Sequence, residues 1–509
     1  MSHFTSDTDR IFCLKDLPEV TKGALFARYS RSSMGLRELY EKEFRGEDAA
    51  AEGFYERVLD GFGDDSVAEL GNAHLALENI SILATKVIED GRIGASYLEK
   101  STRYVDFGEK ENGHYRYYVP HLIQDSSMHY DYVDACDLLF ETYVDLLPKV
   151  KTLLTEQAPD SGNGLDAKGI QARAIKAKAF DLCRGLLPAS TLTNMGINGN
   201  GRYYEAFLIK MMQHSMMEMQ KIGWESRVAL AEVIPSFIRK ANHNNKHYTS
   251  LESHKFHMDV VIASITPSKL EQLPQRVKLL NFDSNAVEKI LTALVYECSD
   301  VSWEEARRQI RRLPEKEIPF IFEQLVGSRT DRRHRLPRAF EHSDYQFEFV
   351  ADFGIYRDLH RHRLITMQRQ QLGCSLGFVI PPEFDDWVFI KEEYSGAINQ
   401  VGEVWHRLIN EVGPTEAQYV VPLASNIRWS MRGNLREWLW ISELRAQPAG
   451  HPNYRKIAQE VRNLICKIHP SLEPIFALVD MNDYSLGRLE AETKRSKKEN
   501  ERDQAAKPI

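Results

Sequence analysis

The sequence has no uninterrupted apolar run near the roughly 18 residues that a membrane-spanning helix needs. Its first ten residues, MSHFTSDTDR, lack the basic and then apolar pattern of a secretory signal. The six cysteines form no C-x-x-C pair and no disulfide-like framework, and neither an H-E-x-x-H segment nor a Cys–His nucleophile pair is recognisable. We therefore expect a cytoplasmic protein with reduced thiols, no membrane segment, no metal site and no nucleophilic triad.

The chain also lacks an excess of basic residues. Its 509 residues include 65 Lys and Arg against 73 Asp and Glu, which gives a formal charge of −8. Apolar residues make up 43% and charged residues 27% of the chain, close to the globular average, so a disordered chain is disfavoured. The acidic balance and the lack of a binding motif disfavour a nucleic-acid-binding protein. The length predicts two or more domains.

A weak internal repeat divides the chain into two halves. Four pairs of segments recur in the same order, with a residue offset of 269 to 272 for the first three pairs and 234 for the fourth. The pairs are Ala24–Ser30 with Ala293–Ser299, Glu69 with Glu341, Asp90–Ser96 with His360–Thr366, and Leu186–Arg202 with Val420–Arg436. The drop in offset predicts an insertion of about 36 residues in the first half, around residues 108–175.

Helical periodicity dominates both halves. Ser302 followed by Glu305 forms a capping box at the start of a predicted helix. Strand-like stretches are shorter, and the segments His114–Pro120 and Gly377–Phe384 combine β-branched and aromatic residues with flanking Pro or Gly. The mixture predicts an α+β fold in which helices outnumber strands, with a mixed sheet in each half.

Arginine and histidine are dense at residues 357–370, which is unusual in a net-acidic protein. Guanidinium groups bind phosphate through two parallel hydrogen bonds, and imidazole can stack on a ring. The run Arg361-His362-Arg363 therefore suits a phosphorylated cofactor with an aromatic part. Taken alone, a solvated helix face with ion pairs explains this segment better.

The matching segment of the first half spans residues 96–105. Glu99, Ser101 and Arg103 alternate there, with Tyr104 behind them. Such a turn offers a hydroxyl, backbone N–H groups and one fixed guanidinium to a phosphate. Taken alone, a strand end with one solvent-facing arginine is again the better explanation.

Together, however, the two segments resemble the two parts of one signature, R-H-R-x-x-S-x-N-E-x-S-x-R-Y, of the flavin-dependent thymidylate synthases. The first half keeps the second part as Ser96, Glu99, Ser101, Arg103 and Tyr104, but has Gly91-Arg92-Ile93 in place of R-H-R. The second half keeps R-H-R, but has Arg369, Gln371 and Gly373 where the family has Glu, Ser and Arg.

Three further motifs of the family are divided in the same way. The H-x-S-x-x-E-H motif is echoed by Asp64, Ser66 and Glu69 in the first half and by Glu341-His342 in the second. The arginine of the family's E-x-A-R-x-x-L-P motif is Arg184 in the first half, and Gln418 stands there in the second. The arginine of the L-R motif is Arg445 in the second half and is replaced by Met211 in the first. Each half has thus lost what the other kept.

The resemblance implies two tandem copies of a flavin-dependent thymidylate synthase-like domain in one chain. It implies a first repeat at residues 1–275, a second at 276–488, and a charged disordered tail at 489–509. The family forms homotetramers with active sites between subunits. The resemblance therefore also implies a homodimer whose four domains correspond to the four subunits of that tetramer.

The implied reaction is the reductive methylation of dUMP to dTMP, with methylenetetrahydrofolate as carbon donor and NADPH as reductant of FAD. The residues implied for the nucleotide are Glu99, Ser101, Arg103, Tyr104, Arg184 and Arg445. The residues implied for FAD are Arg361, His362, Arg363, Ser66, Asn434 and Arg436. We expect Arg103, Arg184 and Arg445 to converge, and Gly373, Gln418 and Met211 to gather at a second location that is closed or apolar.

Other features keep alternatives open. Asp358 stands where the family has a Gln that helps to hold uracil, so the second interpretation is a catalytically inactive or differently specific nucleotide- and flavin-binding homologue. The basic run Arg329–Arg338 suits a nucleic-acid backbone or a pyrophosphate. The histidines between His243 and His257 have zinc-like spacings, but we expect a polar surface loop there.

Overall fold

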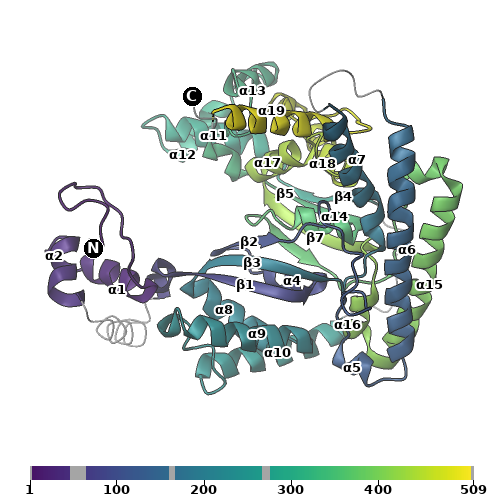
Figure 1. Cartoon of the computed structure of the whole chain (residues 1–509). Coiled ribbons are helices and arrows are strands. Elements are labelled where there is room, and N and C mark those ends of the chain that lie inside the picture. Colours follow the sequence, from purple (N-terminus) through teal and green to yellow (C-terminus); the bar gives the residue numbers. More distant parts are fainter. Residues whose placement is uncertain (1–2, 46–64, 160–166, 266–274, 506–509) are drawn as a thin grey trace. The chain divides into compact units, whose positions relative to one another are not determined.

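A computed structural model of the chain describes residues 3–45, 65–159, 167–265 and 275–505. The chain divides into two compact units that interleave along the sequence, and each has its own sheet (Figure 1). Unit 1 consists of Met1–Lys100, Tyr118–Asp125 and Thr191–Leu270, and unit 2 of Ser101–Tyr117, Ser126–Ser190 and Glu271–Ile509.

Unit 1 is built on a three-stranded antiparallel sheet with the order β1-β3-β2. The strands are β1 (Asn72–Ser81), β2 (Ala95–Glu99) and β3 (Leu192–Asn200). Its helices are α1 (Glu19–Tyr29), α2 (Leu36–Leu39), α4 (Ile82–Glu89), α5 (His121–Gln124), α8 (Gly201–Met212), α9 (Met217–Ala231) and α10 (Lys246–Ile265). Ser81 caps α4 by accepting the N–H of Ala84, and α8 and α9 pack against the sheet.

Unit 2 contains a four-stranded antiparallel sheet with the order β4-β5-β7-β6. The strands are β4 (Val277–Phe282), β5 (Asp344–Asp352), β6 (Thr366–Arg369) and β7 (Asn426–Asn434). Buried aromatic residues pack on this sheet. The Phe349 ring stacks on the Trp429 ring with 5.3 Å between centroids, and the Phe347 ring meets the Trp438 ring edge-on with 4.8 Å between centroids. These buried rings anchor the strands whose ends carry the site.

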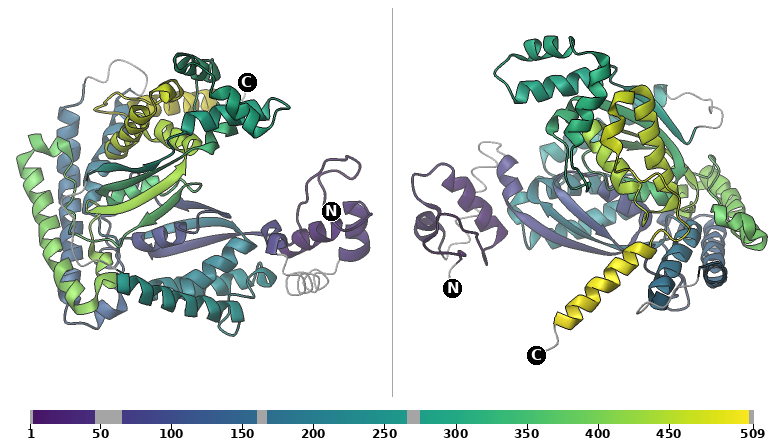
Figure 2. Two further views of the ribbon diagram at one scale, coloured as in Figure 1. Left: turned by 180° about the vertical axis from the view of Figure 1, so that it is seen from behind. Right: turned by 90° about the horizontal axis from the view of Figure 1, so that it is seen from above.

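The helices of unit 2 include the two longest of the described residues, α6 (His129–Glu156) and α15 (Val388–Val412), which pack side by side (Figures 1 and 2). The others are α7 (Ala167–Cys183), α11 (Ala286–Glu297), α12 (Trp303–Ile310), α13 (Ile318–Val326), α14 (Phe353–Leu359), α16 (Pro414–Ala417), α17 (Leu435–Arg445), α18 (Pro452–Ile468) and α19 (Leu489–Ala505). Helices α17 and α18 pack on each other and on the sheet.

The same succession of elements occurs twice along the chain. The series β1-α4-β2, then β3-α8, is followed by β5-α14-β6, then β7-α17, and the corresponding strands pair in the orders β1-β3-β2 and β5-β7-β6. The first residues of β1 and β5 are 272 positions apart, and those of β3 and β7 are 234 apart. Pro188 and Pro422 form an antiparallel bridge within unit 2.

Several expectations can be compared with these elements. The helix-rich α+β class is confirmed, and so is Ser302 as the residue that caps the helix, because its hydroxyl accepts the N–H of Glu305. The prediction of mixed sheets is wrong, since every strand pair in the described ranges is antiparallel. Neither His114–Pro120 nor Gly377–Phe384 forms a strand, and each contains proline, which cannot donate a hydrogen bond to a ladder.

Three other segments differ from the predictions. The His243–His257 segment is mainly the helix α10 rather than a loop. The tail over residues 489–505 forms α19, which packs on α7 and is supported by the i,i+4 pairs Lys494–Glu490 and Arg495–Glu499. The last change from unit 1 to unit 2 falls between Leu270 and Glu271, near the predicted boundary at residue 275, but Ser101–Tyr117 and Ser126–Ser190 of the predicted first repeat belong to unit 2.

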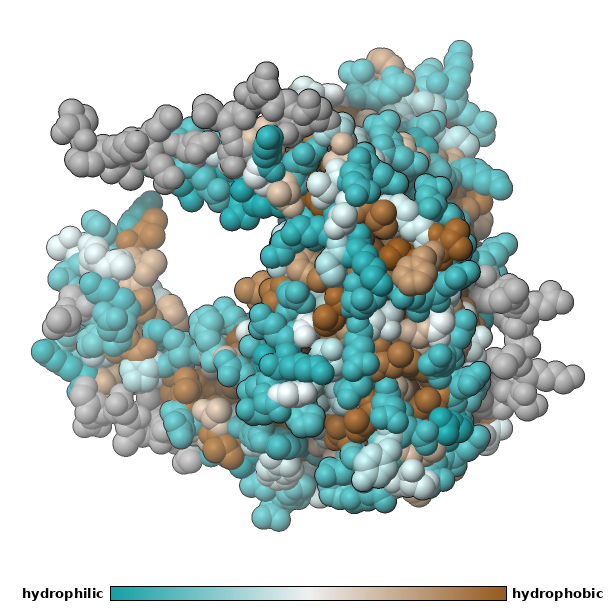
Figure 3. Space-filling view, turned by 45° about the vertical axis from the view of Figure 1, so that its right-hand side comes forward, coloured by the Kyte–Doolittle hydropathy of each residue, from teal (hydrophilic) through white to brown (hydrophobic). Residues whose placement is uncertain are grey.

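Hydrophilic residues cover most of the face shown in Figure 3, with hydrophobic residues in small groups. Over the described parts of the chain, no helix combines the length and the hydrophobicity required to cross a bilayer.

Candidate functional site

Three arginines from distant segments meet in unit 2, and we call Arg103, Arg184 and Arg445 the arginine cluster. Arg103 lies in the turn after β2, Arg184 begins the 3-10 helix that follows α7, and Arg445 is the last residue of α17. The guanidinium carbons of Arg103 and Arg445 lie 5.9 and 5.5 Å from the centroid of the Tyr454 ring. The Tyr454 ring therefore connects two arginines that are 342 positions apart.

Arg103 is held by a two-point ion pair. Its Nε and Nη2 atoms donate to the two carboxylate oxygens of Asp181, both at 2.5 Å, and its Nη1 donates to the Tyr454 hydroxyl at 3.3 Å. Burial is the largest single effect and raises the pKa of the Asp181 carboxyl, but the charge and hydrogen bonds of Arg103, together with smaller effects of His451 and Arg184, hold that pKa below its usual value. Both side chains are buried, so the pair fixes the direction of the guanidinium.

Asp358, near the end of α14, places a second carboxylate in the arginine cluster. Its Oδ2 atom lies 3.3 Å from Nη2 of Arg184, which also donates to the Gly354 carbonyl at 3.3 Å. Burial raises the pKa of the Asp358 carboxyl, but the surrounding guanidinium groups outweigh it and hold that pKa well below its usual value. In decreasing order of effect, these groups belong to Arg184, Arg103, Arg445 and Arg361. Asp358 is therefore ionised at neutral pH.

A neutral histidine connects the arginine cluster to the R-H-R segment. The Nε of Arg445 donates to Nε2 of His362 at 2.9 Å, and Nδ1 of His362 lies 3.5 Å from a carboxylate oxygen of Glu437. Burial lowers the pKa of His362 to about 4, and the charge of Arg445 acts in the same direction. A neutral ring with its proton on Nδ1 satisfies both neighbours.

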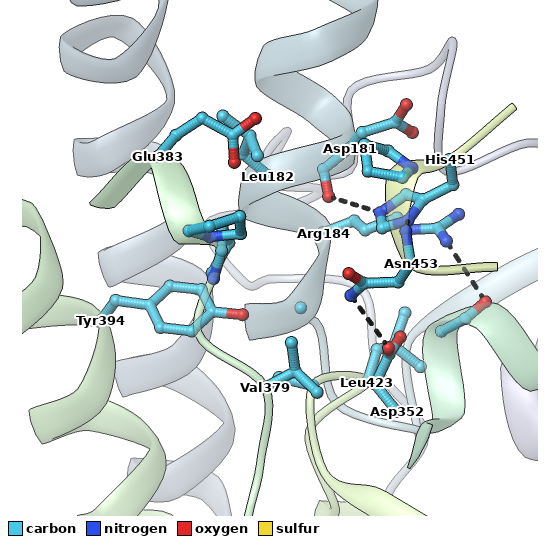
Figure 4. A pocket seen from close by; sticks show the side chains of 16 residues that line it. Asp181, Leu182, Arg184, Asp352, Val379, Glu383, Tyr394, Leu423, His451 and Asn453 are labelled. Atoms are coloured by element: carbon cyan, nitrogen blue, oxygen red, sulfur yellow. Dashed lines mark hydrogen bonds between the residues drawn. The ribbon is translucent and has the colours of Figure 1, made fainter. Parts of the chain in front are cut away.

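A small cavity of about 30 Å³ lies behind Arg184, with room for one or two water molecules (Figure 4). Figure 4 shows Asp181, His451 and Asn453 on one side of it and Tyr394 and Glu383 on the other. Burial lowers the pKa of His451 to about 3, and Arg184 adds to this effect. Neutral His451 contacts the Asp181 carbonyl at 3.4 Å, so this cavity supports the arginine cluster and is too small for a nucleotide.

A larger cavity of about 250 Å³ lies beside His362 and is called the basic cavity. It is lined by six arginines and three glutamates, together with Trp440 and apolar and polar residues. The charged lining residues are Arg329, Arg332, Arg335, Arg361, Arg363, Arg436, Glu341, Glu437 and Glu443. Bidentate pairing of Arg329 with Glu443 at 2.6 Å and a contact of Arg436 with Glu341 at 2.8 Å fix two of its walls.

The basic cavity contains five of the six residues predicted to bind the cofactor. Arg361, His362, Arg363, Asn434 and Arg436 all line it, and the basic run at residues 329–338 contributes Arg329, Arg332 and Arg335. The sixth residue, Ser66, lies in the 3-10 helix Asp65–Leu70 of unit 1, and Asp64 of the same motif lies outside the described residues.

The residues predicted to bind the nucleotide fall into both units. Ser101 accepts the N–H of Arg103 and shapes the turn, and the exposed Tyr104 contacts Arg488, all within unit 2. Glu99 belongs to unit 1, where its buried carboxylate accepts hydrogen bonds from Lys86 at 2.9 Å and Thr85 at 3.2 Å. Within unit 1, Glu99 therefore acts as the partner of a fully buried lysine.

The residues expected at the second, closed location are also divided between the units. A Cβ atom on Gly373 would lie 2.7 Å from the Trp405 ring, so tryptophan fills the space beside Gly373 in unit 2. Gln418 accepts the N–H of Leu372 at 2.9 Å and is buried. Met211 is buried in unit 1.

Four residues around the arginine cluster are not among those predicted from the sequence. They are Asp181, His451, Tyr454 and Glu437. Asp181 had a signal, because it stands where the family's E-x-A-R-x-x-L-P motif has its glutamate. The other three lie in α17, α18 or the loop between them, outside the motifs quoted above, and only the packing of these elements brings them to the arginines. Within the described residues, no group of three His, Cys, Asp or Glu side chains is placed to hold a metal ion.

Comparison with known proteins identifies the family. Residues 19–236 and 285–471 match the family described as thymidylate synthase complementing protein. The chain belongs to this family, which is that of the flavin-dependent thymidylate synthases. The resemblance found in the sequence is thereby confirmed.

Relatives differ in how much of the chain they share. A UPF0159 protein of Chlamydia muridarum is 39% identical, and the match covers 97% of each chain. A UPF0159 protein of Thermoplasma acidophilum is 33% identical over 94% of this chain and 99% of its own length. A probable flavin-dependent thymidylate synthase of Mycobacterium phage L5 is 28% identical over 26% of this chain and 62% of its own length.

Proposed function

We propose that the protein is a flavin-dependent thymidylate synthase that converts dUMP to dTMP with methylenetetrahydrofolate, NADPH and FAD. The observation that carries this proposal is the meeting of Arg103, Arg184 and Arg445 in unit 2, next to a cavity that contains the R-H-R segment. The nucleotide would bind at the arginine cluster and the flavin in the basic cavity.

The charge balance of the arginine cluster supports a dianionic ligand. The three arginines and the nearby Arg361 supply four positive charges, and the carboxylates of Asp181 and Asp358 supply two negative charges. The excess of two positive charges matches the phosphate group of a nucleoside monophosphate. Ion pairs already orient Arg103 and Arg184, so little side-chain freedom is left to lose on binding.

The basic cavity suits part of a flavin dinucleotide. Its volume of about 250 Å³ is just below the range of about 300–1,000 Å³ that is typical of small-molecule sites, so it fits one segment of the cofactor. The Arg332 Nε is buried without a hydrogen-bond partner in the described structure, and a diphosphate oxygen would satisfy it. The guanidinium carbons of Arg332 and Arg335 lie 5.8 and 5.4 Å from the Trp440 ring.

The residues of this chain bind and orient the reactants. When bound, FAD would carry the hydride from NADPH that completes the new methyl group. Arg103, Arg184 and Arg445 hold the nucleotide phosphate, and neutral His362 sets the spacing between the arginine cluster and the basic cavity. Positioning and electrostatic stabilisation therefore account for the protein's share of catalysis.

The cysteines support a reaction without a thiolate nucleophile. Burial raises the pKa of the Cys136 and Cys374 thiols to about 12, and it also raises that of Cys183. These three thiols therefore stay protonated at neutral pH. Cys13 and Cys298 are exposed.

The repeated order of elements supports a tandem duplication. The strand offsets of 272 and 234 match those of the sequence echoes, and α7 has 17 residues where α16 has 4, which accounts for part of the insertion. In unit 1 a Cβ atom on Gly91 would lie 2.8 Å from the Tyr203 ring, so this tyrosine fills the space beside the residues that replace R-H-R. We propose one flavin site per chain and a homodimer.

A specific observation favours a second candidate function. Asp358 remains ionised inside the arginine cluster, and a carboxylate can only accept hydrogen bonds there. A ligand base next to it must present an N–H group. The ring N3–H of uracil can do this, and so can the amino group of another base, so a nucleotide other than dUMP is the alternative. In that case the protein would be a nucleotide- and flavin-binding homologue with a different specificity or no activity.

The test is a spectrum and an activity assay on the purified full-length chain. A flavin absorbance in the visible range, together with dTMP formation that requires dUMP, methylenetetrahydrofolate and NADPH, is expected. A colourless protein that takes up no added FAD contradicts the flavin assignment. Flavin binding without dTMP formation, together with tighter binding of another nucleotide, supports the second candidate.

A further inference from the structure

The C-terminal part of the chain lies outside the family match, which ends at residue 471. Within unit 2 this segment nevertheless reaches the elements that carry the arginine cluster. Helix α19 packs on α7, which carries Asp181 (Figure 1). Lys178 of α7 donates to the Ser485 carbonyl at 2.7 Å. Arg488 immediately precedes α19.

Arg488 contacts the turn that carries Arg103 and Tyr104. Its guanidinium carbon lies 4.4 Å from the centroid of the Tyr104 ring, and its Nη2 donates to the Tyr104 hydroxyl. Its Nε donates to the Ala449 carbonyl at 3.5 Å, and Nη2 of Arg103 donates to the same carbonyl at 3.4 Å. Arg488 is thus joined to Tyr104 directly and to Arg103 through one shared acceptor.

These contacts replace the core packing that the Tyr104 ring lacks, whereas Thr102 and Arg103 of the same turn are buried. Tyr104 is 57% exposed, so buried neighbours do not fix its ring. A guanidinium on the ring face and a hydrogen bond to the hydroxyl restrict the ring to one orientation. The planar fork of arginine can make both contacts and still reach the Ala449 carbonyl, whereas a lysine ammonium cannot.

We propose that Arg488 is a positioning residue of the nucleotide site and that the C-terminal segment completes this site. Arg488 acts through Tyr104 and through the Ala449 carbonyl that it shares with Arg103. This inference rests on the proposed function, because it assigns the turn at residues 101–104 to nucleotide binding.

The first test measures backbone hydrogen exchange in the ligand-free full-length protein. Arg103, Tyr104 and Val105 have amides that donate within the turn, to the hydroxyl or the carbonyl of Ser101. Arg488→Ala is expected to speed their exchange by about threefold or more, because the turn opens more often. The matched control is Lys494→Ala, which removes one exposed charge that pairs with Glu490 within α19. Equal exchange in Arg488→Ala and the unaltered protein overturns the proposal.

The second test measures dUMP binding by titration calorimetry with the same variants. Arg488→Ala is expected to weaken dUMP binding by about threefold to tenfold, and Lys494→Ala to leave it unchanged. Arg488→Lys should recover only part of the loss, and full recovery overturns the two-contact geometry. If the unaltered protein binds no dUMP, the proposed function fails, while the exchange experiment still decides whether Arg488 positions the turn.

Discussion

Arg103 and Asp181 form a bidentate pair, with two nitrogen-to-oxygen distances of 2.5 Å, although 78 positions separate them in the chain. Asp181 comes from α7 and Arg103 from the turn after β2. Because a buried carboxylate already orients it, Arg103 is held in one direction before any ligand arrives. The same holds for Arg184, which Asp358 and the Gly354 carbonyl restrain.

Arg103→Ala and Arg445→Ala are each expected to weaken dUMP binding by at least about tenfold, roughly 1.4 kcal/mol. A phosphate dianion needs several fixed cations to offset its loss of water, so the two effects should be non-additive when combined. Calorimetric titration of the single and double variants measures both quantities. Arg333→Ala, at an exposed arginine outside the cluster, is the control, and strictly additive effects contradict a shared ligand.

The double variant Arg361→Ala with Arg363→Ala is expected to be folded but colourless. Each charge-assisted hydrogen bond to the flavin contributes about 1.5–3 kcal/mol, so the loss of both guanidiniums removes most of the affinity. Visible absorbance after gel filtration measures the flavin content, and circular dichroism measures folding. The control replaces the exposed Arg308 and Arg312 by Ala, and an unchanged flavin content in the Arg361 and Arg363 variant contradicts the assignment.

The stability of the protein is expected to fall as the pH falls from about 6.5 to about 4. Burial lowers the pKa of His362 from 6.5 to about 4, so in this range the unfolded chain binds a proton that the folded chain does not. The contribution of His362 is fully present above about pH 6.5 and amounts to about 3 kcal/mol at most. Buried His451, whose pKa is about 3, acts in the same direction.

Urea unfolding at several pH values checks this dependence. His362→Gln should have a smaller loss of unfolding free energy between pH 6.5 and 4 than the unaltered protein, because glutamine does not titrate. The exposed His334→Gln variant is the control. An identical pH dependence for His362→Gln and the unaltered protein contradicts a neutral, buried His362.

Asp358→Asn is expected to lower the free energy of unfolding by about 1–3 kcal/mol, because Arg184 loses its charged partner. It should also bind dUMP more tightly at low salt, since the excess positive charge in the arginine cluster rises from two to three. Chemical unfolding and dUMP titration measure these two effects. Loss of dUMP binding in a folded Asp358→Asn variant would instead indicate that the carboxylate accepts a hydrogen bond from the base.

A homodimer with one flavin per chain is expected. The two fused copies that we propose would need only two chains to form the four-domain assembly that the family resemblance implies. Light scattering measures the mass, and flavin absorbance relative to protein concentration measures the cofactor ratio. A monomer mass contradicts the proposed four-domain homodimer. Two flavins per chain contradict the proposal that Tyr203 fills the space beside Gly91 in unit 1.

Features that depend on local order follow from the linear chain alone. The capping residue Ser302 and the helix-rich class follow from short-range periodicity, which neighbouring residues impose on the backbone. The family signature likewise survives in linear spacing, which is why Arg361, His362 and Arg363 pointed to the family before any fold was considered.

Which charged side chains meet depends on the folded arrangement of segments that are distant in the chain. No spacing in the chain indicates that Asp181 faces Arg103, that His362 lies between Arg445 and Glu437, or that Arg488 reaches Tyr104. The antiparallel pairing of the strands and the helix at residues 489–505 were also missed, because both depend on packing partners distant in sequence. Such contacts depend on which apolar faces are buried together. Burial of these faces brings together charged side chains whose pairing no local sequence pattern sets.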